Sequence, residues 1–214
     1  MTDCSYVNNM IKEKYKLRDS IIPTIFSSII ASIGILTDSN TVVAGSMLLS
    51  PLLGPITYLI NDTFKFKNIK KMSGTMTILI AISMFNGFII SKLFKNKNFE
   101  LISTLPLINM TKELRSRTTK NLYLYSFIIA IICGVIYITT FSDGVESDKG
   151  FLGEEVFITA IGLCISVLPP LAASGIYIER GEYINALSCY ALFFLNVFGF
   201  LLGAVICKKY HCKN

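Results

Sequence analysis

Charged residues are scarce in this sequence. Only 16% of its 214 residues are Asp, Glu, Lys or Arg, whereas 52% are hydrophobic, and a soluble domain usually carries about a quarter charged residues. This shortage excludes an ordinary soluble globular domain, and the abundance of apolar residues excludes an intrinsically disordered chain. The composition therefore predicts an integral, multi-pass membrane protein whose main partner is the lipid bilayer.

Residues that commonly carry chemistry are equally few. The only histidine is His211, and no serine in an apolar block has a histidine or lysine partner. General-base, nucleophilic and metal-dependent mechanisms each lack a member, and no glycine-rich phosphate loop is present. Cys207, His211 and Cys212 form a weak metal-ligand pattern that a solvated tail explains better. We therefore expect no enzymatic activity, no catalytic residue, no cofactor and no bound metal.

Apolar residues are concentrated in long blocks. About 20 such residues in a helix cross a hydrocarbon core of roughly 30 Å. Six blocks reach or approach that length: 21–36, 41–61, 73–92, 122–141, 155–178 and 184–207. Each block should be helical, because backbone groups in lipid find no water to bond. The sequence therefore predicts an all-α, polytopic helical membrane protein with about six apolar segments.

Polar segments organise the chain around these blocks. The predicted bounds are 1–20 for a basic N-terminal segment, 21–207 for a single transmembrane domain, 21–92 and 122–207 for its halves, 93–121 for a polar or interfacial linker and 208–214 for a polar tail. Lysines and arginines gather between the blocks, where they would meet anionic lipid headgroups; Arg115 and Arg117 are among them. This scattered placement argues against a nucleic-acid partner.

The two halves resemble each other in three places. Their first helices share an Ile-Ile-Ala-x-Ile pattern, at Ile29–Ile33 and Ile128–Ile132, their second blocks each contain two prolines, and their third helices each carry one asparagine. The matches occur in the same order, which indicates two pseudo-repeated halves. Chance similarity in an isoleucine-rich chain is the alternative.

The prolines of the second blocks indicate interrupted helices. An interior proline removes a helix hydrogen bond and leaves backbone groups that lipid cannot satisfy. Interrupted segments in matching positions of two halves point to a substrate or ion site at the bilayer midplane. The candidate pathway residues come from these segments and from the two asparagines: Ser46, Ser50, Pro51, Gly54, Pro55, Asn86, Ser166, Pro169, Pro170 and Asn196.

Each of these features also has a purely structural explanation. A proline kink can serve packing alone, and an asparagine can bond a neighbouring helix. Small residues at four-residue spacing, such as Gly199 and Gly203, allow close helix contact within the chain or in a homo-oligomer. Ionisable side chains are nearly absent from the block interiors, which argues against a carboxylate-driven proton pump.

Two topologies fit the blocks. Six full crossings, three in each half, would relate the halves by inverted topology. If each proline-containing block instead enters and leaves on one face, the cations are divided more unevenly between the two sides, as the positive-inside rule prefers. However, about ten residues per arm reach only half of the hydrocarbon core. Length therefore favours six crossings.

Several motifs resemble one family of membrane proteins. Ser27–Ser39 followed by Val42–Ile56 is similar to the signature of the uncharacterised hydrophobic family called domain of unknown function 389. Glu113–Thr118 resembles the family's arginine segment, and Ile165–Leu171 resembles one of its closing segments. The resemblance covers about residues 20–207. It implies a multi-spanning membrane protein and supplies no known activity, ligand or catalytic residue.

The paired interruptions predict a function in transport. Hydroxyls, asparagine amides and unwound carbonyls suit a neutral solute or a weakly held cation. We therefore expect a passive or weakly coupled transporter or channel for a small solute or an ion. A membrane scaffold or assembly partner that transports nothing is the alternative.

Overall fold

Helices form the fold in the residues that the structure describes. The computed structural model describes residues 17–61, 66–95, 112–142, 161 and 165–211, and their regular structure is helical. The main helices are α2 (Leu17–Leu36), α3 (Asn40–Leu48), α4 (Leu53–Asn61), α5 (Phe66–Lys95), α6 (Lys112–Ser116), α7 (Lys120–Ser142), α9 (Leu168–Glu179) and α10 (Tyr183–His211). The predicted helical class is confirmed for these residues.

Three of the described helices are long and apolar enough to cross a membrane. They lie within Ser73–Lys95, Leu122–Thr139 and Tyr183–Tyr210. The other three predicted blocks give shorter helices. The apolar part of α2 is limited to Ser20–Leu36, block 41–61 is divided into α3 and α4 of 9 residues each, and the described end of block 155–178 forms the 12-residue α9.

Some predicted features lie outside the described residues. These are most of the basic segment 1–20, the larger part of the linker 93–121, the first part of block 155–178 and the end of the tail 208–214. The described part of the linker includes α6, which packs against α2.

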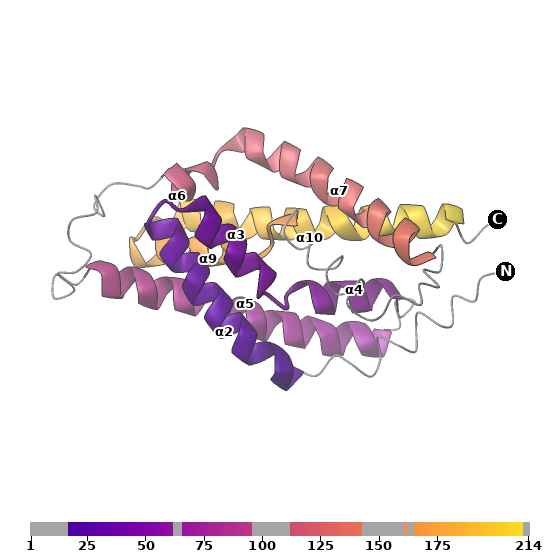
Figure 1. The fold of residues 1–214 in the computed structure, drawn as a ribbon, viewed down its shortest axis with the longest axis horizontal. Helices are drawn as coiled ribbons and strands as arrows, with labels where there is room; N and C mark the ends of the chain where they lie inside the picture. The colour runs from indigo at the N-terminus through magenta and orange to yellow at the C-terminus, as the bar shows by residue number, and fades with distance from the viewer. Residues whose placement is uncertain (1–16, 62–65, 96–111, 143–160, 162–164, 212–214) are drawn as a thin grey trace.

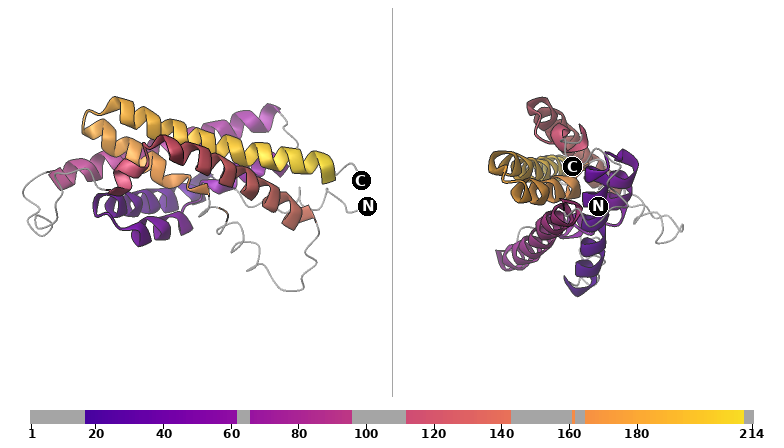
Figure 2. Two further views of the ribbon diagram at one scale, coloured as in Figure 1. Left: turned by 90° about the horizontal axis from the view of Figure 1, so that it is seen from above. Right: turned by 90° about the vertical axis from the view of Figure 1, so that its left-hand side faces the viewer.

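In each predicted half, the first and third helices point toward the same end of the molecule, although α2 is inclined to α5 (Figure 1). α2 and α5 lead toward one end of the molecule, and α7 and α10 lead toward the other (Figure 1). α7 and α10 lie side by side in both views of Figure 2. Between α2 and α5 the chain returns through α3 and α4, and Lys208 Nζ near the end of α10 donates to the Ile60 carbonyl oxygen near the end of α4 at 2.9 Å. α2 and α5 therefore run in the opposite direction to α7 and α10 (Figure 1).

Glycines allow two helix pairs to touch backbone to backbone. α5 and α9 meet where a Cβ on Gly87 would overlap a carbonyl oxygen of α9 and a Cβ on Gly175 would overlap the carbonyl oxygen of Met84. α7 and α10 meet where a Cβ on Gly203 would overlap the carbonyl oxygen of Ile131. The close contact predicted at Gly203 is confirmed, and it lies within the chain.

A tight polar turn reverses the chain between α2 and α3. Asp38 has a φ of 57°, in the left-handed region that aspartate tolerates better than most residues. Ser39 caps α3 by accepting a hydrogen bond from the Val42 amide at 3.5 Å. The turn lays α3 back against α2 and leaves the Asp38 side chain exposed.

Candidate functional site

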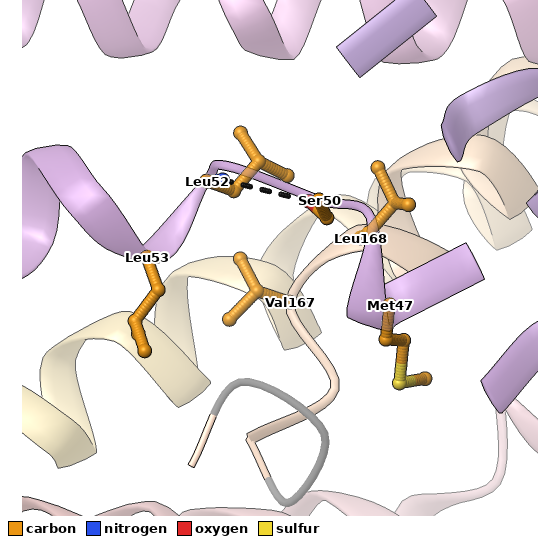
Figure 3. A pocket seen from close by; sticks show the side chains of 6 residues that line it. All are labelled: Met47, Ser50, Leu52, Leu53, Val167 and Leu168. Carbon is orange, nitrogen blue, oxygen red and sulfur yellow. Dashed lines mark hydrogen bonds between the residues drawn. The ribbon is translucent and has the colours of Figure 1, made fainter. Parts of the chain in front are cut away.

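The interrupted segments of the two halves meet around a small hollow. α3 ends at Leu48 and α4 begins at Leu53, and the residues between them face those that open α9 (Figure 3). The hollow has a cavity volume of about 10 Å³, which is room for about one water molecule. Its lining comes from both halves of the chain: Met47, Ser50, Leu52, Leu53, Val167 and Leu168.

Local hydrogen bonds support the turn between α3 and α4. The Ser50 amide donates to the Met47 carbonyl at 3.2 Å, and the Gly54 amide donates to the Pro51 carbonyl at 3.1 Å. Ser50 Oγ accepts from the Leu52 amide at 3.5 Å (Figure 3). The turn therefore satisfies several backbone groups that an interrupted helix would otherwise leave unpaired.

Ser166, which precedes the second lining segment, has a strained backbone. Its φ of 50° lies in the left-handed region, and a non-glycine residue stays there only when its surroundings enforce it. Asn196 on α10 holds this segment, because its Nδ2 donates to the carbonyl oxygens of Ile165 at 2.8 Å and Ser166 at 3.5 Å. Arg117 Nη1 also donates to Ser166 Oγ at 2.9 Å.

Arg117 reaches this point from the residue after α6. Its side chain is 13% exposed, and its Nη2 pairs with the carboxylate of Glu113, 16% exposed, at 3.1 Å. Two further bonds hold α6 in place. The Tyr177 hydroxyl of α9 donates to the Leu114 carbonyl at 3.0 Å, and the Glu113 amide donates to Asp38 Oδ1 at 2.8 Å. The residues of this largely buried ion pair therefore link α6 to two other places, the α2–α3 turn through the Glu113 amide and the segment before α9 through Arg117 and Ser166.

Two buried polar atoms of this cluster have no hydrogen-bond partner among the described residues. They are Arg117 Nε, which is a donor, and Asn196 Oδ1, which is an acceptor. The Asn196 residue is only 1% exposed. Since an unsatisfied buried group costs about 1–3 kcal/mol, atoms of this kind indicate a place for water or for a ligand.

The other hydroxyl and amide candidates of the first half bond within that half. Ser46 is fully buried, and its hydroxyl donates to the Val43 carbonyl at 2.6 Å. Asn86 Nδ2 donates to Ser28 Oγ at 2.7 Å and to the Ile25 carbonyl at 3.3 Å, both on α2. For Asn86 the structure thus shows the helix-bonding alternative.

The candidate prolines are found mainly where helices begin. Pro51 lies in the turn before α4, and Gly54 and Pro55 are in the first turn of that helix. Pro169 and Pro170 are buried in the first turn of α9. Proline is tolerated there because the first amides of a helix have no intrahelical acceptor. The structure brings these turns together but does not place the prolines inside continuous helices.

Sequence reasoning missed Arg117 and Glu113 as members of the site. Arg117 was expected among cations at lipid headgroups, whereas its guanidinium points into the fold. The available signal was the Glu-x-x-x-Arg spacing, which allows a pair along one helix turn. Nothing in the sequence shows that Tyr177 fixes α6 against α9 and so directs Arg117 inward.

Comparison with known proteins identifies the family. The family described as domain of unknown function (DUF389) matches residues 47–202, more than half of the chain. An uncharacterised protein of Methanocaldococcus jannaschii is 25% identical over 195 residues, which cover 88% of this chain and 53% of that relative. The chain thus spans about half the length of the curated relative it matches. No solved structure matches the chain. As its motifs predicted, this chain belongs to the DUF389 family.

Proposed function

We propose that this chain is a membrane protein of six crossings, arranged as two halves of inverted topology. The shared direction of α2 and α5 supports the proposal, because the segment between two crossings in the same direction has to cross in the opposite direction (Figure 1). α3 and α4 contain 9 residues each, and end to end they would rise about 27 Å. That length is close to the roughly 30 Å of a hydrocarbon core.

The distribution of polarity supports a lipid environment. Exposed apolar side chains recur every four residues along α7: Leu124, Ile128, Ile132 and Ile136. Buried hydroxyls of α2 donate to carbonyls of their own helix, Thr24 to Ser20 at 2.7 Å and Ser32 to Ser28 at 2.7 Å. An apolar exterior with internally satisfied polar groups is what lipid requires.

Cysteine labelling tests the six crossings. In a variant whose native cysteines are replaced by alanine, single cysteines would be placed at Lys67, Lys95 and Lys209. We expect an impermeant maleimide to label Lys67→Cys and Lys209→Cys from the same side and Lys95→Cys from the other. If Lys95→Cys is instead labelled from the same side as Lys209→Cys, the chain contains re-entrant segments and the six-crossing arrangement is wrong.

In this proposal the protein moves a small solute or ion passively or with weak coupling. The observation that carries it is the hollow whose lining comes from both halves of the chain: Met47, Ser50, Leu52 and Leu53 from the first, Val167 and Leu168 from the second. Paired interrupted segments are where carriers of this construction place their sites. Because the hollow has room for about one water molecule, the proposal requires the two segments to separate before a solute can pass.

Filling the hollow should stop transport. We expect Ser50→Phe to reduce flux into liposomes by roughly tenfold or more, since an added barrier of about 1.4 kcal/mol suffices. Gly45→Phe is the matched control, because a Cβ at Gly45 meets nothing within 4 Å. Flux would be measured with purified protein over a panel of ions and small solutes.

The same assay separates transport from the scaffold alternative. Flux that is equal in Ser50→Phe and in Gly45→Phe would remove the hollow from the pathway. Wild-type protein that moves nothing across the panel, while both variants remain folded, would favour a scaffold or assembly role.

A further inference from the structure

The cluster around Arg117 has hydrogen-bonding capacity that the protein itself does not use. The guanidinium donates from Nη1 to Ser166 and from Nη2 to Glu113, and its Nε has no partner among the described residues. Ser166 Oγ accepts from Arg117, which leaves its own proton available for donation. At least two donors, Arg117 Nε and the Ser166 hydroxyl, are therefore available beside the hollow.

The cluster also offers one acceptor. Asn196 is 1% exposed, and its Nδ2 is bound to the carbonyls of Ile165 and Ser166. This places its amide at the same strained segment, with Oδ1 unpaired within the described part of the chain. A ligand that satisfies all of these groups has to present acceptor oxygens to Arg117 and Ser166 and one donor to Asn196.

The hydrogen-bonding geometry of the Arg117 guanidinium favours an oxyanion as the ligand. A guanidinium holds oxyanions through directed hydrogen bonds, more strongly than neutral acceptors. α9 begins at Leu168 with no side-chain cap, so its positive end lies two residues after Ser166. Glu113 balances Arg117 when no ligand is bound and competes with an anion for it. The sequence favoured a neutral solute or a weakly held cation because it did not place the Arg117 guanidinium at this site.

We propose that Arg117, Ser166 and Asn196 form a binding site for a small monovalent oxyanion that carries a hydroxyl group. Its charged oxygens bond Arg117 and Ser166, and its hydroxyl donates to Asn196 Oδ1. Bicarbonate is the simplest probe of this class. The inference rests on the proposed transport function, since Ser166 adjoins Val167 and Leu168 of the hollow.

Binding can be measured without transport. The purified full chain in detergent would be titrated with sodium bicarbonate, at a pH where this ion predominates, and with sodium nitrate at equal ionic strength. Nitrate is a planar monovalent oxyanion of similar size that has no hydroxyl. We expect a saturable rise in melting temperature with bicarbonate only, because a ligand that binds the folded state stabilises it. An equal response to both salts, or no response to bicarbonate, would overturn the proposal.

Matched variants locate the site. Arg117→Lys keeps the charge but removes Nε and the planar fork, and we expect it to abolish the response. Arg115→Lys is the control, because Arg115 is an exposed arginine on α6. If Arg117→Lys does not fold, Ser166→Ala provides the test, with an expected loss of affinity of about tenfold. Wild-type affinity in Ser166→Ala, or a lost response in Arg115→Lys, would contradict the assignment.

Flux data distinguish this proposal from the broader one. Transport of some other solute without bicarbonate binding would overturn the oxyanion site and leave the transport proposal standing. Bicarbonate binding that Arg117→Lys abolishes, in a protein that moves no solute, would support the site and contradict transport.

Discussion

Replacing Gly175 with alanine is expected to lower the free energy of unfolding by about 3 kcal/mol, at the upper end of the usual cost of overpacking. The added Cβ would overlap the Met84 carbonyl oxygen and would lie 2.9 Å from the Phe88 amide nitrogen. Both obstacles are backbone atoms of α5, so no side-chain rotation can relieve the overlap. α9 would have to move away from α5 and would carry the Val167–Leu168 segment with it.

Thermal unfolding of the purified protein in detergent, followed by circular dichroism, measures this effect. Gly45→Ala is the control, because it makes the same chemical change in a helix where a Cβ meets nothing within 4 Å. Helix propensity alone should make Gly45→Ala neutral or more stable by up to about 1 kcal/mol. A Gly175→Ala protein as stable as Gly45→Ala would show that α5 and α9 do not touch as described.

Arg117→Met should destabilise the protein by a similar amount. Removing one member of a buried ion pair costs about 3–5 kcal/mol, because the other charge is left without its partner. We expect the lower end of that range, since the Arg117 and Glu113 side chains keep 13% and 16% exposure. The change also deprives Ser166 Oγ of its donor. The readout is the shift in unfolding midpoint relative to wild type.

A double variant tests whether charge is the cause. In Arg117→Met combined with Glu113→Gln, the stranded carboxylate is replaced by a neutral amide, so the double variant should be more stable than Arg117→Met alone by about 2 kcal/mol. Further destabilisation by Glu113→Gln in the Arg117→Met background would mean that the ion pair does not account for the loss.

Composition and block length predict the helical class because they depend only on local physics. Long apolar runs such as 73–92 and 184–207 have to satisfy their backbone groups within one helix in lipid, and they correspond to the long helices α5 and α10. The positions of the prolines in the shorter blocks do not follow from local physics. Pro51 lies between two nine-residue helices, whereas Pro169 and Pro170 open α9, and the same residue type is compatible with both positions.

The roles of the asparagines could not be predicted from their matching positions. Asn86 and Asn196 occupy corresponding places in the two halves, yet Asn86 bonds α2 and Asn196 bonds the segment before α9. Which acceptor lies within reach depends on how neighbouring helices cross. That crossing depends in turn on glycine contacts, such as those of Gly175 and Gly203, formed by residues distant in the sequence.

The sequence by itself determined the helical class and the family, and it predicts the organisation into two halves. These rest on hydrophobic runs and local motifs, which act over a few helical turns. Only the tertiary structure decided that Arg117 turns inward to Ser166 and that Ser50 faces Val167 and Leu168. An exposed and a buried arginine look alike in a linker, because the contacts that hold α6 come from distant parts of the chain: the Tyr177 hydroxyl, 63 residues after Leu114, and the Asp38 carboxylate, 75 residues before Glu113.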